Sequence, residues 1–233
     1  MDDLNGVALY RREGAGPTVV FMPGYASDMT GSKAVALDDW AARTGHAFVR
    51  FDYRGCGASA GAFEDFTLED WRDDALAVID SVTGPVVLVG SSMGGWIMLL
   101  AALARPERVS ALVGIAAAPD FTEWGFDDAQ KAALMTDGRV EEASVYGPPM
   151  VTTLGFWNSG QRNLLIGHDI ALDMPVRLLQ GQCDNDVPWR QSLVLADCLR
   201  SADVQVTLVK DGDHRLSRPQ DIDLLISTIE SLS

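Results

Sequence analysis

Short apolar runs alternate with segments of helical hydrophobic spacing along most of the chain. The runs at 18–22, 47–51 and 86–89 are typical of buried strands, because they are short, rich in β-branched or aromatic residues, and followed by glycine-containing turns. Similar runs lie at 111–116, 176–179 and 204–209, and the last begins with the alternation of an edge strand.

Segments with helical spacing separate these runs. In residues 32–44 the apolar residues fall on one face, and Gly45 marks the end of the predicted helix. Thr67 and Asp70 form a capping-box pattern at the start of a second helix. Strands that are apolar throughout and alternate with helices predict a mostly parallel sheet covered on both faces. Further helices are expected at 94–104, 188–199 and around 222–229.

The alternation breaks once, over residues 119–173, where no clear strand is found. This segment is too long for an ordinary connection. We interpret it as a small cap inserted into a single domain of residues 1–233, over the carboxyl edge of the sheet, where such folds bind ligands. An apolar cluster in it either forms the core of the cap or lines a substrate pocket: Met150, Val151, Leu154, Phe156 and Trp157. Leu154, Phe156 and Trp157 are the substrate-binding candidates.

Composition excludes several classes of partner. The 233 residues are 47% hydrophobic, which suffices for a large core, and the net charge is −15 with a pI near 4.4. Such a surface repels nucleic-acid phosphates and anionic lipid. No apolar run reaches the roughly 20 residues of a membrane span. The acidic start, the odd number of cysteines and the absence of a CxxC pattern predict a cytoplasmic protein without disulfides.

One short motif points to nucleophilic chemistry. Residues 90–94 fit G-x-S-x-G only when Ser92 is the central residue, because Ser91 in that position would be flanked by Val89 and Met93. A β-branched strand precedes the motif and an apolar helix follows it, which is the context of a nucleophile elbow. The sequence therefore predicts Ser92 as a nucleophile and Ser91 as a small packing residue.

A serine hydroxyl needs a base to remove its proton. In strand–helix folds with this elbow, the acid and then the histidine follow the serine along the chain. His46 precedes the serine and His168 falls in the predicted cap, so His214, after a late strand, is the candidate base.

The acid is less strongly specified. Asp184 lies on the loop that leaves the strand at 176–179, and we predict it as the acid. Asp186, two residues further on, and Asp120, after the preceding strand, remain alternatives. A solvated acidic loop would also account for the first two.

An acyl-transfer intermediate needs hydrogen-bond donors for its oxyanion. The backbone N–H of Met93, directly after the nucleophile, is one candidate. The second comes from the loop after the first core strand, where we choose the backbone N–H of Tyr25 and expect Gly24 to allow close approach. The Tyr25 side chain is not predicted to be essential.

These motifs together resemble the α/β-hydrolases, and more narrowly the mitochondrial abhydrolase-domain-containing acyl-protein thioesterases and their bacterial relatives. The matching stretches are "FMPGYASDMTGSKA", "FDYRGCGAS", "GSSMGGWIML", "DVPW" and "DHR". The resemblance covers nearly the whole chain and places its serine, aspartate and histidine at Ser92, Asp184 and His214. It implies hydrolysis of S-acyl cysteine thioesters and of carboxylic esters, acyl glucuronides included, without a cofactor.

The sequence therefore predicts a serine hydrolase that cleaves esters or thioesters of small molecules or acylated proteins, with no metal site. A C–C bond hydrolase or lactonase would use the same three residues with a different cap. A non-catalytic interaction protein on the same scaffold is the alternative from another class. The triad does not distinguish ester from thioester, since it acts on the carbonyl in both.

Overall fold

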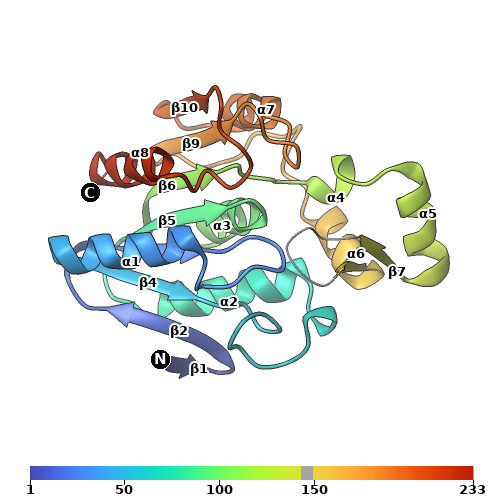
Figure 1. The fold of residues 1–233 in the computed structure, drawn as a ribbon, viewed down its shortest axis with the longest axis horizontal. Coiled ribbons are helices and arrows are strands. Elements are labelled where there is room, and N and C mark those ends of the chain that lie inside the picture. The colour runs from blue at the N-terminus through green and yellow to red at the C-terminus, as the bar shows by residue number, and fades with distance from the viewer. Residues whose placement is uncertain (143–148, 233) are drawn as a thin grey trace.

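A single large sheet organises the molecule. The structure is a computed structural model, and it describes residues 1–142 and 149–232. Within these residues the sheet has eight strands in the order β1-β2-β4-β3-β5-β6-β9-β10 (Figure 1). β1 and β2 are antiparallel to their neighbours, and the pairs from β4 to β10 are parallel. The strands are β1 (Asp2–Leu4), β2 (Val7–Arg12), β3 (Ala15–Met22), β4 (His46–Phe51), β5 (Val86–Ser91), β6 (Val109–Ile115), β9 (Val176–Gly181) and β10 (Val204–Val209).

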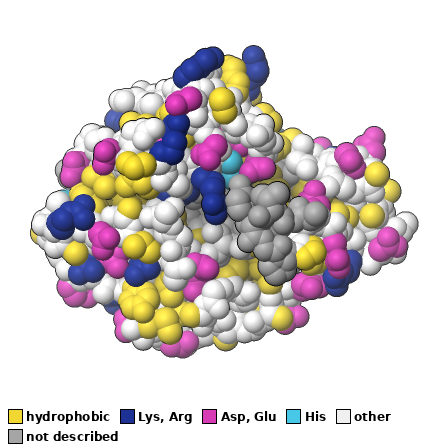
Figure 2. Space-filling view, in the orientation of Figure 1, with side chains coloured by type: hydrophobic (Ala, Val, Ile, Leu, Met, Phe, Trp, Pro, Cys, Tyr) yellow, Lys and Arg dark blue, Asp and Glu magenta, His cyan; other side chains and the backbone are white. Residues whose placement is uncertain are grey.

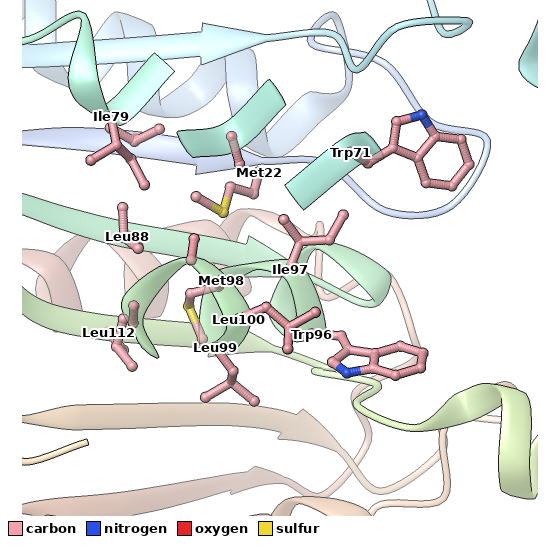
Figure 3. Packing of buried hydrophobic residues seen from close by; sticks show 14 of the residues in the cluster. Met22, Trp71, Ile79, Leu88, Trp96, Ile97, Met98, Leu99, Leu100 and Leu112 are labelled. Carbon is pink, nitrogen blue, oxygen red and sulfur yellow. The ribbon is translucent and has the colours of Figure 1, made fainter. Parts of the chain in front are cut away.

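Helices cover both faces of the sheet, as the apolar strands predict. α1 (Ser32–Thr44) and α8 (Pro219–Glu230) pack on one face. α2 (Leu68–Asp80), α3 (Met93–Ala104) and α7 (Arg190–Cys198) pack on the other. Alternate residues of a strand contribute to the hydrophobic cores on the two sides of the sheet, because successive side chains point to opposite faces. Figure 3 shows the larger core, where Met22 and Leu88 of the sheet meet Ile79 of α2 and Met98 of α3.

The predicted helix ends are confirmed. The Thr67 side chain accepts a hydrogen bond from the backbone N–H of Asp70, whose carboxylate accepts one from the backbone of Thr67. Gly45 ends α1 with a φ of 77°, a conformation that glycine adopts without a steric penalty. A single 3-10 turn, η1 (Phe63–Asp65), precedes α2.

The segment 119–173, called the insertion below, lies between β6 and β9 beyond the carboxyl ends of the parallel strands (Figure 1). The expectation that it holds no strand is wrong, because β7 (Arg139–Glu142) and β8 (Met150–Thr153) form an antiparallel pair. Each strand is too short for a periodic signal. The β1–β2 hairpin was not predicted either. The insertion also holds α4 (Phe121–Trp124), α5 (Asp128–Asp137) and α6 (Leu154–Arg162).

Candidate active site

The G-x-S-x-G segment forms a strained turn between β5 and α3. Ser92 has φ 55° and ψ −121°, a conformation that side-chain-bearing residues rarely adopt. A Cβ on Gly90 would lie 2.4 Å from the carbonyl oxygen of Gly94, and one on Gly94 would lie 2.2 Å from that of Met22. Both positions therefore require glycine, and the turn raises Ser92 above the end of β5 while Ser91 remains buried.

The loop after β3 approaches this turn closely at Gly24. A Cβ on Gly24 would lie 3.3 Å from the Cβ of Ser92, tighter than an ordinary contact. Tyr25 follows Gly24, and Met93 is the first residue of α3, so its backbone N–H has no acceptor within the helix. Tyr25, Ser92 and Met93 line one cavity, which is the arrangement that two oxyanion donors beside a nucleophile need.

The predicted acid and base are hydrogen-bonded to each other. Asp184 Oδ2 lies 2.9 Å from His214 Nδ1, and it also accepts a hydrogen bond of 2.8 Å from the Gln180 side chain. The other carboxylate oxygen accepts the backbone N–H groups of Asp186 and Val187, both at 2.8 Å. Burial raises the pKa of Asp184, but the hydrogen bonds from His214, Val187 and Asp186 outweigh it and hold the pKa below its ordinary value. The carboxylate is therefore the stable form at neutral pH.

The two alternative acids occupy different positions. Asp120 is buried, and its carboxylate accepts the backbone N–H groups of Leu165 and Ile166, so it joins the two ends of the insertion. Asp186 is exposed and lies beside the pair, since ligand atoms of Asp184, Asp186 and His214 are within 4.8 Å of one another. Over the described ranges this is the one cluster with metal-ligand spacing, and it contains the candidate acid and base themselves.

Ser92 and His214 open into one cavity of about 630 Å³. The insertion and the β6 end form one wall with apolar side chains, while Lys33 and Arg215 lie on the wall made by α1 and the loop after β10. On the face in Figure 2 a histidine near the centre is flanked by acidic side chains, with a basic side chain close by. The apolar residues that the insertion contributes are Phe121, Trp124, Phe126 and Met150.

The structure does not bring the three substrate-binding candidates to this cavity. Among the described residues that line it, Leu154, Phe156 and Trp157 are absent. Phe156 is fully buried against Tyr25, Trp71 and Phe121, and the Trp157 indole donates to the carbonyl of Thr122. α6 packs against α2 and α4, so Phe156 and Trp157 belong to the packing of the insertion, whereas Met150 of the same apolar cluster lines the cavity. The helical spacing of the apolar residues predicts that α6 has an apolar face, but it does not specify the element against which that face packs.

Sequence reasoning missed the role of the Tyr25 side chain. Its hydroxyl donates a 2.7 Å hydrogen bond to the carbonyl of Val151 in β8, and its ring packs edge-on against Phe63 and Phe121. The residue that offers the candidate oxyanion N–H therefore also holds the insertion in place. Lys33 and Arg215 were missed as well, because isolated basic residues carry no motif.

The glycine-rich stretch after β4 supports the rim of the site. Asp52 is buried and accepts the backbone N–H groups of Met29, in the loop after β3, and of Ala58. A Cβ on Gly57 would lie 2.1 Å from the Asp52 carboxylate. The stretch therefore fixes the loop that carries Gly24 and Tyr25.

Comparison with known proteins agrees with the fold. A sequence model described as the alpha/beta hydrolase fold matches residues 17–144. The chain belongs to the alpha/beta hydrolase family. Within it, the chain is 42% identical over 240 residues to "Palmitoyl-protein thioesterase ABHD10, mitochondrial" of Mus musculus, covering 99% of this chain and 80% of the mouse protein.

Two solved alpha/beta hydrolase structures are similar over nearly their full length. A crystal structure from Agrobacterium vitis S4, named only as a hydrolase, has a TM-score of 0.92 at 44% identity and covers 97% of this chain and 92% of its own. Alpha/beta hydrolase domain-containing protein 10 from mouse has a TM-score of 0.90 at 42% identity, covering 97% and 93%. The predicted fold class and family resemblance are thus confirmed.

The predicted cytoplasmic location is contradicted. The mouse and human relatives, at 42% and 40% identity, are named mitochondrial proteins. An acidic composition and free cysteines describe the folded chain and do not distinguish one reducing compartment from another. Across residues 1–142 and 149–232, no helix has the length and hydropathy needed to cross a bilayer.

Proposed function

We propose that this alpha/beta hydrolase cleaves acyl thioesters, and carboxylic esters by the same steps, with Ser92, His214 and Asp184 as catalytic triad. The observation that carries the proposal is the 2.9 Å contact of His214 with buried Asp184, in the cavity that also contains Ser92 on its strained turn. The mouse relative is named a thioesterase, which supports the choice of acyl bond.

The geometry suggests a step for each residue. Ser92 Oγ attacks the acyl carbonyl carbon while His214 takes the hydroxyl proton. Asp184 holds the imidazole in one tautomer and stabilises the imidazolium that forms. The backbone N–H groups of Tyr25 and Met93 stabilise the oxyanion. His214 then protonates the leaving thiolate or alkoxide, and water releases the acid from acyl-Ser92 by the same steps.

The apolar character of one cavity wall supports a position for the acyl group. We assign it to the apolar wall of Phe121, Phe126 and Met150, in place of the α6 residues expected from the sequence. Burial of each methylene is worth about 0.8 kcal/mol, so this wall favours longer acyl groups. The substrates are then fatty acyl thioesters of proteins or of small molecules.

Two measurements test the proposal. A fluorophosphonate probe should label wild-type protein and leave Ser92→Ala unlabelled, with Ser91→Ala labelled as a matched control. A panel of acyl thioesters and p-nitrophenyl esters of increasing chain length should be hydrolysed with kcat/KM rising with length. Labelling of Ser92→Ala, or a protein inert towards the whole panel, would overturn the proposal.

A further inference from the structure

Lys33 lies on the wall of the catalytic cavity although the proposed mechanism does not use it. It is the second residue of α1, which begins directly after the loop that carries Gly24 and Tyr25. The main cavity and an adjoining hollow of about 90 Å³ share Lys33, Gly24 and Ser91 in their walls. The lysine therefore lines the same two cavities as the oxyanion loop and the nucleophile turn.

The surroundings of Lys33 lower its pKa and so raise the neutral fraction of its amine. Burial, and then the positive charge of Arg215, lower the pKa of Lys33 to about 8, while Asp213 and Asp221 act in the opposite direction. At pH 7 about one amine in ten is then neutral, against fewer than about one in a thousand for an ordinary lysine. Its Nζ donates a 2.6 Å hydrogen bond to the carbonyl of Arg215, which holds the amine at the cavity wall. Asp28 is a further acidic residue in the smaller hollow.

We propose that Lys33 is an acyl acceptor, which takes the acyl group from acyl-Ser92 to form a stable amide at the cavity wall. The inference rests on the proposed function, because that function supplies the acyl-serine. The neutral amine of Lys33 attacks the ester carbonyl carbon, a C–N bond forms, and the bond from that carbon to Ser92 Oγ breaks. His214 takes the proton from the nitrogen and returns it to Ser92, so no other reactant is required.

The amide is a dead end for this site. An amide nitrogen is a far poorer leaving group than a thiolate, and acylated Lys33 can no longer carry a positive charge. Acylation would therefore persist after the thioester is consumed and would leave a covalent record of turnover. This persistence distinguishes the amide of Lys33 from the ester of Ser92, which is hydrolysed in every catalytic cycle.

The chain contains its own matched controls. It has three lysines, Lys33, Lys131 and Lys210. The Lys131 amine donates to the carbonyl of Glu123 in the insertion, and Lys210 is exposed at the end of β10. Neither is among the described residues that line the cavity. Non-specific acylation in solution would reach these two lysines as well, and it would not depend on Ser92.

The test uses the full-length chain and the octanoyl thioester of N-acetylcysteamine at pH 7.5. Alkaline hydroxylamine then removes serine esters and cysteine thioesters, and peptide mapping locates the octanoyl amides that remain. We expect the amide on Lys33 in at least about tenfold excess over Lys131 and Lys210, because Lys33 lines the cavity in which acyl-Ser92 forms and the other two lysines do not. Ser92→Ala should lose this excess, and Lys33→Arg should lose the amide at that site.

Two results would overturn the inference: equal acylation of the three lysines, or a Lys33 excess that persists in Ser92→Ala and so bypasses acyl-serine. Hydrolysis of the thioester is followed in the same samples. Absence of hydrolysis would mean failure of the proposed function. Normal hydrolysis without the Lys33 amide would remove only this inference.

Discussion

His214 Nδ1 lies 2.9 Å from Asp184 Oδ2, and the Asp184 side chain has 0% exposed surface while that of His214 has 24%. The imidazole therefore faces the cavity on one side and a buried carboxylate on the other. The Gln180 amide and two backbone N–H groups bind the same carboxylate and hold it in place. This network fixes the ring orientation before a substrate binds, which is what preorganised acid–base catalysis requires.

Replacement of Ser92 and of Ser91 by alanine should change kcat by very different amounts. Ser92→Ala removes the nucleophile, so we expect kcat to fall by roughly 10⁴- to 10⁶-fold. Ser91→Ala removes a buried hydroxyl at the end of β5 and should change kcat by less than about tenfold. Thioester hydrolysis under saturating substrate measures both. An active Ser92→Ala beside an inactive Ser91→Ala would place the nucleophile at Ser91.

The three candidate acids can be separated by amide substitutions. Asp184→Asn should lower kcat by about 10⁴-fold with a preserved fold, because the histidine tautomer is no longer fixed. Asp186→Asn should have a small effect on kcat. Asp120→Asn should mainly lower the melting temperature, since Asp120 binds Leu165 and Ile166 at the base of the insertion. A collapse of kcat in either control with an active Asp184→Asn would transfer the role of acid.

The close approach at Gly24 predicts a kinetic effect from one methyl group. In Gly24→Ala the new Cβ would lie 3.3 Å from Ser92 Cβ, so the loop with the Tyr25 N–H must shift by a few tenths of an ångström. We expect kcat to fall by roughly 10- to 100-fold. Gly31→Ala is the matched control, because its Cβ meets Asp28 at an ordinary 3.5 Å. Equal kcat values in the two variants would argue against the oxyanion role of this loop.

The acyl wall should be visible in a chain-length profile. In the wild type we expect kcat/KM to rise about fourfold per methylene until the wall is filled, from about 0.8 kcal/mol per methylene. Phe126→Ala should flatten this rise and leave acetyl turnover nearly unchanged. Trp157→Ala should instead lower the melting temperature and leave the slope parallel to that of wild type, because Trp157 binds Thr122 outside the cavity. A slope lost in Trp157→Ala and kept in Phe126→Ala would reverse the two assignments.

The lowered pKa of Lys33 predicts a pH-dependent stability. Between pH 8, near its folded pKa, and pH 10.4, its usual unfolded value, the unfolded chain binds the extra proton. The stability that Lys33 contributes is therefore present above about pH 10.4 and is lost as the pH falls through about 8. Urea unfolding measures the free energy of unfolding of wild type and of Lys33→Met at each pH. The difference between the two values isolates the contribution of Lys33, because the contributions of the other groups cancel. A difference that is constant from pH 8 to 10.4 would contradict the lowered pKa.

Much of the fold follows from local patterns in the sequence. The central parallel strands are apolar on both faces, and the capping box at Thr67 and the Gly45 terminus are local signals, so the positions of these elements were predicted within a few residues. The β7–β8 pair escaped prediction because its strands have only four residues each and include glutamates and threonines. A strand of that length is defined by its partner and not by its own periodicity.

The sequence by itself determined which residues are suited to the chemistry. The spacing of Gly90, Ser92 and Gly94 specifies a turn, because the two glycines are the residues that fit there, and chain order reduced three histidines to His214. Only the tertiary structure separates the surroundings of two candidate acids, since Asp184 contacts His214 whereas Asp120 binds Leu165 and Ile166, all distant in sequence. The tertiary structure alone also determines which side chains line the cavity. A side chain's neighbours depend on how whole elements pack, and the direction in which α6 turns its apolar face is not encoded in that helix.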